Sequence, residues 1–233
     1  MPSILAKLLN GNTADLQSLR CIISGAAPLP PHLVDSVFQK TGAEIYNLYG
    51  TSETGFSILA TPDDLRKHPA TIGKKLSRVQ INIINEEGKS VQEDEVGSLC
   101  IKSPWAMLQE IPAWVATGDV AFFDSEGYYY LQGRLDEMII AGGENVYPVI
   151  LENKLLQHYA VKDAAAIGVA DEIFGQRLKA FVVLFELITK EELFAWLSNQ
   201  LARHQQPVAI VFLLELPYNS TGKPDKKALA QLK

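Results

Sequence analysis

Cysteine and histidine are scarce in this sequence, which has two cysteines and four histidines among 233 residues. Two cysteines cannot form the disulfide framework of a small secreted domain. Cys21 and Cys100 each stand in a short apolar, strand-like stretch, so we expect both to be buried, reduced thiols. The histidines are scattered along the chain without the spacing of zinc ligands, and we predict no zinc site.

The sequence also has no excess of positive charge and no long apolar run. Lysine and arginine total 21 against 27 acidic residues, a net charge of -6 without any basic block, so we do not expect nucleic acid as a partner. The apolar run within residues 1–16 is too short and too soon polar for a signal peptide or a membrane span, and we expect a cytoplasmic protein. With 47% apolar residues, the chain is long enough for one or two hydrophobic cores.

The first part of the chain has two different patterns. Residues 1–65 contain an apolar strand at 21–24, a helix that can begin at Pro31, and a second strand at 44–49, which is an α/β arrangement. Residues 70–135 contain short alternating strands separated by glycine-bearing turns, which predicts a small antiparallel sheet or barrel.

The last part, residues 136–233, has an α+β pattern. Pro148 can begin a helix, strands are expected at 164–169, 181–185 and 210–214, and the capping box Thr189-Lys190-Glu191-Glu192 predicts another helix. We therefore predict a mixed α/β and α+β protein with domains at 1–135 and 136–233.

The segment NLYGTSETG, from Asn47 to Gly55, follows a predicted strand and concentrates groups that could bind a nucleotide. Its backbone N–H groups and hydroxyls, including that of Ser52, could bind a phosphate, Tyr49 offers an aromatic face for a base, and Glu53 offers a carboxylate for a hard cation. A simple polar turn would have the same composition, so both interpretations stay open.

Two further segments carry charge at the ends of predicted strands. Thr117-Gly118-Asp119 begins one strand, and Arg134 ends the next. A carboxylate can accept two hydrogen bonds from a ribose diol, and an arginine can bind the same sugar or a phosphate. Solvated strand ends would explain each residue singly.

The segments GRLDEMIIAGGENVYP, residues 133–148, and NSTGK, residues 219–223, complete the set. The first places charges beside an apolar run that ends in two glycines, and the second places Lys223 in a polar loop before a short helix. The lysine could reach an anionic group, although an ordinary surface lysine fits the same pattern.

Taken in this order, NLYGTSETG, TGD, GRLDEMIIAGGENVYP and NSTGK resemble the successive motifs of the AMP-forming acyl-CoA synthetases, members of the adenylate-forming superfamily. With SGAAPLP at residues 24–30 and HPATIGK at residues 68–74, the chain is most similar to o-succinylbenzoate and fatty-acid CoA ligases. The resemblance covers about the C-terminal half of such an enzyme, because no segment here matches the Pro-Lys-Gly phosphate loop of the family.

The resemblance implies a fold and a two-step reaction. Residues 1–135 would be the C-terminal portion of the large AMP-binding domain, with a partial αβ subdomain and a β-barrel-like subdomain, and residues 136–233 would be a small mobile domain. A carboxylic acid would react with ATP and Mg²⁺ to give an acyl-adenylate, and CoA would then displace AMP.

The resemblance also implies roles for individual residues. Lys223 and Glu53 would be catalytic, with Glu53 holding Mg²⁺, Asp136 would be the hinge, and the CoA channel would contain Gly142, Gly143 and Glu144. The residues expected to bind the nucleotide, ATP or AMP, are Gly25, Ala26, Asn47, Tyr49, Gly50, Ser52, Asp119 and Arg134.

The chain departs from the family pattern at Ser52, where threonine is usual, and at Ile150, where relatives have glutamate. The segment between Ser103 and Trp114 is also shorter than expected. Three interpretations remain open: a truncated or split ligase that needs a separate N-terminal half, a non-catalytic module that binds nucleotide or CoA, and an adenylation domain that loads a carrier protein. The identity of the acid is not predicted.

Overall fold

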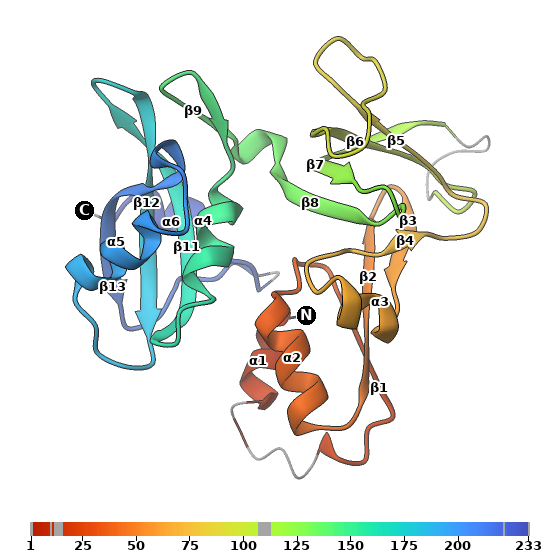
Figure 1. Ribbon diagram of the computed structural model, residues 1–233, viewed down its shortest axis with the longest axis horizontal. Helices are drawn as coiled ribbons and strands as arrows, with labels where there is room; N and C mark the ends of the chain where they lie inside the picture. The colour runs from red at the N-terminus through yellow and green to blue at the C-terminus, as the bar shows by residue number, and fades with distance from the viewer. Residues whose placement is uncertain (1, 10, 12–15, 107–112, 221, 233) are drawn as a thin grey trace. The chain divides into compact units, whose positions relative to one another are not determined.

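The computed structural model describes residues 2–9, 11, 16–106, 113–220 and 222–232. The chain forms two compact units, Met1–Gln132 and Gly133–Lys233, which are described separately below (Figure 1). Most of the unusually short segment between Ser103 and Trp114 lies outside the described residues. No helix among the described residues has the length and hydropathy that a membrane span requires.

The first unit begins with a four-stranded sheet of order β1-β2-β3-β4. Its strands are β1 (Cys21–Gly25), β2 (Glu44–Thr51), β3 (Gly55–Ala60) and β4 (Lys74–Lys75). Strands β1 and β2 are parallel, and the helix α2 (Pro31–Lys40) forms the crossover that such a pair requires. The predicted strand, helix and strand of this region are confirmed, and the sheet continues through antiparallel pairing to Lys75.

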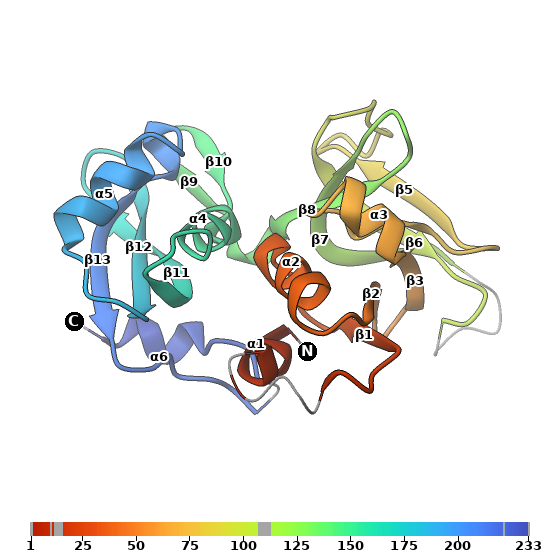
Figure 2. The same cartoon turned by 60° about the horizontal axis from the view of Figure 1, so that its bottom comes forward.

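Helices cover one face of this sheet. Helix α2 begins with proline at its first turn, buries Leu33, Val34 and Val37, and ends before Gly42, which has a φ of +67°. Helix α1 (Pro2–Leu9) lies beside α2 and adds Leu5 to the same core (Figures 1 and 2). Neither α1 nor α3 (Pro62–Lys67) was predicted, because each is too short for a clear helical periodicity.

The opposite face of β1 is uncovered by the described residues. Ile23 is 65% exposed and Cys21 is exposed, whereas Ile22 packs against the helices. The prediction that Cys21 is buried is therefore wrong: β1 is an edge strand, and Cys21 lies on its uncovered face. Cys100, in a strand of the second sheet, is buried as predicted, and both thiols are free.

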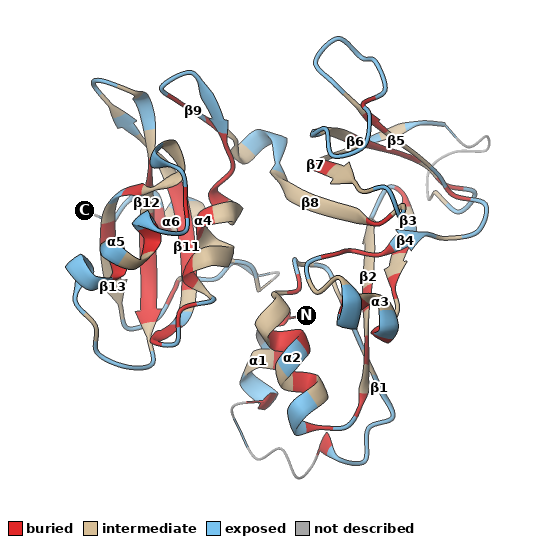
Figure 3. Ribbon diagram, viewed as in Figure 1, coloured by how far each residue is buried: buried red, intermediate tan, exposed pale blue. Residues whose placement is uncertain are grey.

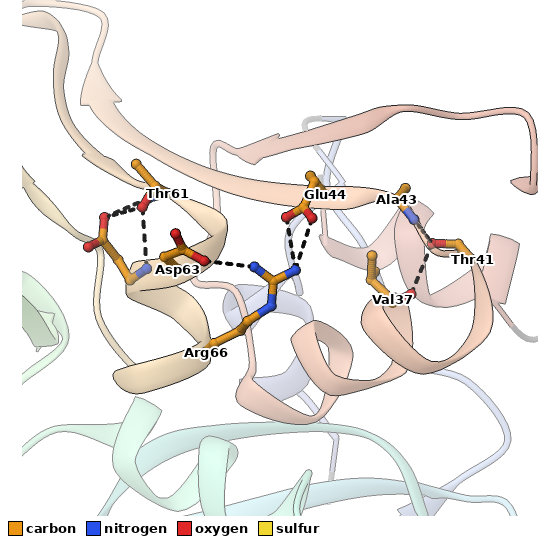
Figure 4. Close-up of polar contacts among 8 residues, drawn as sticks. Val37, Thr41, Ala43, Glu44, Thr61, Asp63 and Arg66 are labelled. Atoms are coloured by element: carbon orange, nitrogen blue, oxygen red, sulfur yellow. Dashed lines mark hydrogen bonds and ion pairs between the residues drawn. The ribbon is translucent and has the colours of Figure 1, made fainter.

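Polar contacts attach α3 to β2. Arg66 donates from Nη2 to both carboxylate oxygens of Glu44, each at 3.0 Å, and from Nη1 to Asp63 at 3.0 Å (Figure 4). Thr61 caps α3 in a reciprocal capping box with Asp64. Because both ion pairs are solvent-exposed and screened by water, they add little to the stability of the unit.

The second sheet of this unit has the strand order β5-β6-β7-β8. Its strands are β5 (Gln80–Ile84), β6 (Gly97–Lys102), β7 (Val115–Phe123) and β8 (Tyr129–Arg134). Val79, Leu99 and Ile101 are among its buried core residues. The predicted antiparallel strands and turns are confirmed, including the turn closed by the Asp124 N–H donating to the Tyr128 carbonyl.

The second unit is built on a five-stranded sheet of order β10-β9-β12-β11, with β13 paired to β12. Its strands are β9 (Ile139–Ala141), β10 (Glu144–Val146), β11 (Val161–Asp171), β12 (Gly175–Leu184) and β13 (Pro207–Leu213). Its helices are α4 (Pro148–Leu155), α5 (Lys190–Ser198), α6 (Lys226–Ala230) and the 3-10 turns η2 (Leu135–Glu137) and η3 (Arg203–Gln205).

Strands β11 and β12 are largely buried (Figure 3), and their side chains contribute to hydrophobic cores on both faces of the sheet. Side chains alternate along a strand, so Ala164 and Ala166 pack on the face covered by α4 and α5, whereas Ala165 and Ile167 pack with Leu229 of α6. The predicted helices at Pro148 and at the Thr189 capping box are confirmed. All three strands begin earlier than predicted, whereas β12 and β13 each end one residue before the predicted ends at 185 and 214.

Candidate functional site

Tyr49 and Asp119 form the centre of the candidate site in the first unit. Tyr49 lies on β2 and packs against the core of the second sheet, and its Oη donates to Oδ2 of Asp119 on β7 at 2.6 Å. The Asp119 N–H donates to Oγ1 of Thr117 at 3.1 Å, and that hydroxyl donates to the Leu99 carbonyl at 2.9 Å. The structure thus brings together an aromatic ring and a carboxylate that the sequence placed in separate motifs.

The turn between β2 and β3 carries Ser52 and Glu53, both exposed. The Thr51 and Thr54 hydroxyls lie 3.2 Å apart, and each accepts from the other residue's backbone N–H, which fixes the turn. A Cβ on Gly50 would lie 2.2 Å from the Gly55 carbonyl oxygen, so only glycine allows the two strands to approach this closely. The turn presents a hydroxyl and a carboxylate to solvent on a rigid support.

Gly25, Ala26 and Asn47 lie where β1 and β2 run side by side. A Cβ on Gly25 would lie 2.8 Å from the Leu48 carbonyl, and Ala26 has a φ of +67°, which is strained for a residue with a side chain. Asn47 is buried and donates from Nδ2 to the Thr71 carbonyl at 3.5 Å. Next to it in register, the buried Ser24 hydroxyl has no hydrogen-bond partner among the described residues. Strain and a buried polar group at the end of a parallel strand are typical of a ligand site.

Arg134 and Asp136 form an ion pair where the second unit begins. Arg134 ends β8, and its Nε donates to Asp136 Oδ1 at 3.1 Å, while Nη2 donates to Oδ2 at 3.4 Å. The hydrogen bond from Arg134 is the main cause that lowers the pKa of Asp136 below its ordinary value. Both side chains are exposed in the turn η2 and its approach.

Gly142, Gly143 and Glu144 occupy the hairpin between β9 and β10. The two glycines have φ values of +63° and +90°, which a residue with a side chain rarely adopts. The Gly142 N–H donates to the Phe174 carbonyl at 3.0 Å, and a Cβ on Gly142 would lie 2.9 Å from the Phe174 ring. Gly143 and Glu144 are exposed at the tip.

A cleft of about 210 Å³ lies beside this hairpin. The Arg177 and Arg203 guanidinium groups lie 5.5 Å and 6.0 Å from the Phe174 ring centroid. The residues that line the cleft are Ala141, Gly142, Glu144, Phe174, Arg177, Arg203 and His204. Two guanidinium groups and an aromatic ring can bind an anionic ligand that has a flat ring system. Sequence reasoning missed this cleft, because its walls come from three separate segments.

Lys223 lies on the loop between β13 and α6 and is exposed. Its N–H donates to Asn219 Oδ1 at 3.0 Å, and its carbonyl accepts from the Asn219 N–H at 2.9 Å. Gly222, at a φ of +73°, completes this tight turn. The Tyr218 hydroxyl donates to Asp163 Oδ2, which attaches the start of the loop to β11. The loop therefore holds the backbone of Lys223 while leaving its ammonium group accessible.

Lys226, three residues later, is partly buried between two carboxylates. Its Nζ lies 2.6 Å from Glu137 Oε2 and 3.2 Å from Glu152 Oε1. Burial is the main cause that raises the pKa of Glu152, opposed by Lys226 and by the Ala166 N–H. Burial alone would lower the pKa of Lys226, but the two carboxylates outweigh it and the pKa is raised. Lys226 is therefore charged at neutral pH.

The described residues contain no cluster of three or more histidine, cysteine or acidic side chains that could hold a metal by itself. A single exposed carboxylate such as that of Glu53 still fits Mg²⁺, which commonly binds one or two carboxylates and takes its other ligands from phosphates and water.

Comparisons with known proteins match both parts of the chain. The family model described as AMP-binding enzyme matches residues 1–109, and the model described as AMP-binding enzyme C-terminal domain matches residues 151–223. A 2-succinylbenzoate–CoA ligase of Bacillus cytotoxicus is 34% identical over 99% of this chain and 51% of its own length. An indoleacetate–CoA ligase of Aromatoleum aromaticum is 32% identical over 94% of this chain and 46% of its own length.

Solved structures of related enzymes have a fold similar to that of this chain. An amide bond synthetase from Marinactinospora thermotolerans superposes with a TM-score of 0.90 at 30% identity, over 98% of this chain and 51% of that one. The o-succinylbenzoate CoA synthetase from Bacillus subtilis, in complex with its acyl-adenylate intermediate, superposes with a TM-score of 0.87 at 29% identity, over 100% and 50%. The chain spans about half the length of the curated relatives it matches. The resemblance drawn from the motifs and the predicted fold class are confirmed.

Proposed function

Because the chain belongs to the AMP-binding enzyme family, we propose that it acts as the C-terminal half of an ATP-dependent acid–CoA ligase. The observation that carries the proposal is the Tyr49–Asp119 pair beside the hydroxyl-bearing turn at Ser52 and Glu53. In the proposed reaction a carboxylate oxygen attacks the α-phosphate of ATP and pyrophosphate leaves. The CoA thiol then attacks the acyl carbonyl, loses its proton, and AMP leaves.

We assign the nucleotide to the site around Tyr49. The tyrosine ring would stack on adenine, while Asp119 would accept hydrogen bonds from the ribose hydroxyls, assisted by Arg134. Ser52 would donate to the α-phosphate, and the backbone at Gly25, Ala26 and Gly50, supported by Asn47, would line the pocket. Mg²⁺ would neutralise phosphate charge, and Glu53 would supply one of its ligands.

Lys223 is the residue to which we assign the adenylation step. Its ammonium group would bridge the carboxylate of the acid and the α-phosphate as negative charge builds up in the transition state. The fixed backbone of its turn supports this role, because a preorganised charge stabilises a transition state more than a mobile one. Asp136 would be the hinge at which the second unit turns between the two half-reactions.

We assign CoA to the hairpin at Gly142, Gly143 and Glu144 and to the cleft beside it. The absence of a side chain on the glycines would leave room for the pantetheine arm. Arg177 and Arg203 would pair with the phosphates of CoA, and Phe174 would contact its adenine ring.

We propose further that activity needs a separate N-terminal half that carries the phosphate loop. The uncovered face of β1 supports this, because parallel strands are normally covered on both faces. Ile23, at 65% exposure, and the exposed Cys21 would be covered by that half. The curated relatives are about twice as long as this chain, so the part of them that the chain does not match has the length expected of such an N-terminal half.

The test is pyrophosphate release. The chain is mixed with ATP, Mg²⁺ and a panel of acids that includes 2-succinylbenzoate and indoleacetate, with and without the N-terminal half of the Bacillus cytotoxicus ligase. Sustained, acid-dependent release that requires both halves supports the proposal. Tight binding of AMP or CoA without release in either mixture would instead favour a non-catalytic binding module. Release of pyrophosphate with acyl transfer to a carrier protein but not to CoA would favour the third interpretation.

A further inference from the structure

The ion-pair network of Glu137, Lys226 and Glu152, referred to here as the acidic clamp, joins three segments of the second unit that are far apart in sequence. Glu137 lies on the turn η2, Glu152 on α4, and Lys226 at the start of α6. The contact between Lys226 and Glu137 spans 89 residues of sequence at 2.6 Å. One ammonium group thus holds two carboxylates from different elements.

The clamp is anchored in the sheet through Glu152. Its Oε1 accepts from the Ala166 N–H at 2.8 Å, and Ala166 belongs to β11, which lies at the edge of the sheet. The Glu152 carboxylate therefore accepts from an N–H of an edge strand and also pairs with the partly buried ammonium. With Ala166 and Glu152 fixed, Lys226 has a defined position, and Glu137 is the member that it holds at the surface.

The clamp lies between the two features of this unit to which the proposed function assigns a role. Glu137 directly follows Asp136, the proposed hinge, and Lys226 is three residues after Lys223, the proposed adenylation lysine. The intervening backbone is ordered by hydrogen bonds: Asp225 N–H donates to the Pro217 carbonyl at 2.8 Å, and Asp225 caps α6. A change at the turn would therefore be transmitted to the lysine loop over a short, hydrogen-bonded path.

A stabilising role alone gives a poor account of this arrangement. Removing most of the Glu152 carboxylate and of the Lys226 ammonium from water is costly, and buried ion pairs often contribute nothing net relative to apolar residues of similar size. What such a network does supply is a single defined geometry. The charge also fits this purpose, because an ammonium group can donate to both carboxylates and offset the repulsion between them.

We propose that Lys226 is a positioning residue whose grip on Glu137 fixes the loop of Lys223 to the turn that follows Asp136, so that loop and turn move as one body. The proposed hinge at Asp136 then ends before Glu137, and its flexible residues are confined to Leu135 and Asp136. The part of this inference that concerns catalysis rests on the proposed ligase function, whereas the coupling of loop and turn does not.

Hydrogen exchange on the 233-residue chain tests the coupling without any activity assay. Glu137→Gln leaves the Lys226–Glu152 contact in place, so the core of the unit should stay folded. We expect exchange about tenfold faster or more at both the turn, reported by the Met138 amide, and the loop, reported by the Gly222 and Asp225 amides. Amides in β11 and β12 should not change.

Variants of the lysine sharpen the test. Lys226→Met should accelerate hydrogen exchange at the turn and the loop. Lys226→Arg keeps the charge, so exchange at both segments should stay close to that of the wild type. The matched control is Lys227→Met, an exposed neighbour on the same helix, which should change exchange at neither segment. Unchanged exchange in Glu137→Gln, a change confined to one of the two segments, or a uniform change across the unit would each overturn the proposal.

Activity provides the second measurement, on the enzyme reconstituted with the N-terminal half. Glu137→Gln should lower kcat for adenylation at least tenfold and change thioester formation from preformed acyl-adenylate by less than threefold, because only the first step uses Lys223. Equal loss in both steps would contradict a positioning role. If the wild-type mixture releases no pyrophosphate, the proposed ligase function fails, and the exchange result still decides the coupling.

Discussion

Tyr49 and Asp119 are 70 residues apart in sequence, yet the tyrosine hydroxyl lies 2.6 Å from the aspartate carboxylate. The contact joins β2 of the first sheet to β7 of the second, so it stabilises the first unit and also orients two residues of the proposed nucleotide site. The two roles of this pair can be distinguished by experiment, because the stability of the fold can be measured without any ligand.

Tyr49→Phe removes the hydroxyl and keeps the ring. We expect the free energy of unfolding to fall by about 1.5–3 kcal/mol, the range for a hydrogen bond to a charged group, as measured by urea denaturation. Tyr46→Phe, on the same strand, should change it by less than about 0.5 kcal/mol. Equal effects of the two substitutions would show that the contact with Asp119 contributes nothing.

Lys223→Ala should impair adenylation in the reconstituted enzyme. Loss of a preorganised charge at the transition state costs about 3 kcal/mol or more, so kcat/KM for pyrophosphate release should fall at least about 100-fold. Lys227→Ala is the control, since Lys227 is an exposed lysine close by in sequence. A Lys223→Ala enzyme with normal pyrophosphate release would remove Lys223 from the mechanism.

Gly50→Ala should distort the turn that carries Ser52 and Glu53. The added Cβ would lie 2.2 Å from the Gly55 carbonyl oxygen, a distance that forces the strands apart. We expect a destabilisation of about 1–3 kcal/mol and a weaker affinity for AMP by calorimetry. Gly42→Ala, where the added Cβ meets nothing within 4 Å but φ is +67°, should destabilise the chain without changing the affinity for AMP.

The capping residue Asp64 predicts a pH dependence of stability. Burial would raise the pKa of Asp64, but hydrogen bonds from Thr61 and Tyr128 outweigh it and lower the pKa below 3.8. Since the folded pKa lies below the unfolded value, the stabilisation is complete well above pH 3.8 and is lost as the pH falls through the folded pKa.

Asp64→Ala should therefore lower the free energy of unfolding by about 1–2 kcal/mol near neutral pH, and the difference from wild type should disappear in strong acid. Urea denaturation across the pH range measures this. The hydrogen bond to Asp64 is also the main cause that raises the pKa of Tyr128 to about 12, so the substitution should bring it back toward 10.0 in an ultraviolet titration. A stability difference that persists in acid would contradict the assignment.

The two thiols should differ in reactivity. Cys21 is exposed, whereas Cys100 is buried and burial raises its pKa, so a thiol reagent should label Cys21 promptly and Cys100 only after denaturation. Adding the N-terminal half should protect Cys21 if that half covers β1. Prompt labelling that persists in an active complex would place the N-terminal half elsewhere, and Cys21→Ser confirms which thiol reacts.

The sequence by itself determined the family, the fold class and the order of the longer helices and strands, but not the short helices α1 and α3. These depend on local signals: Pro31 and Pro148 begin helices, the Thr189 capping box begins another, and apolar alternation marks the strands. The motifs also identified Tyr49, Asp119 and Lys223 as candidates, because these motifs stand along the chain in the same order as in the family that they resemble.

Only the tertiary structure decided which of these residues meet and which are covered. It joined Tyr49 to Asp119, left Cys21 exposed on an edge strand, assembled the cleft at Arg177 and Arg203, and placed Lys226 between Glu137 and Glu152. The physical reason is that periodicity and turn chemistry act over a few residues, whereas contacts between distant segments depend on how strands pair and which faces helices cover.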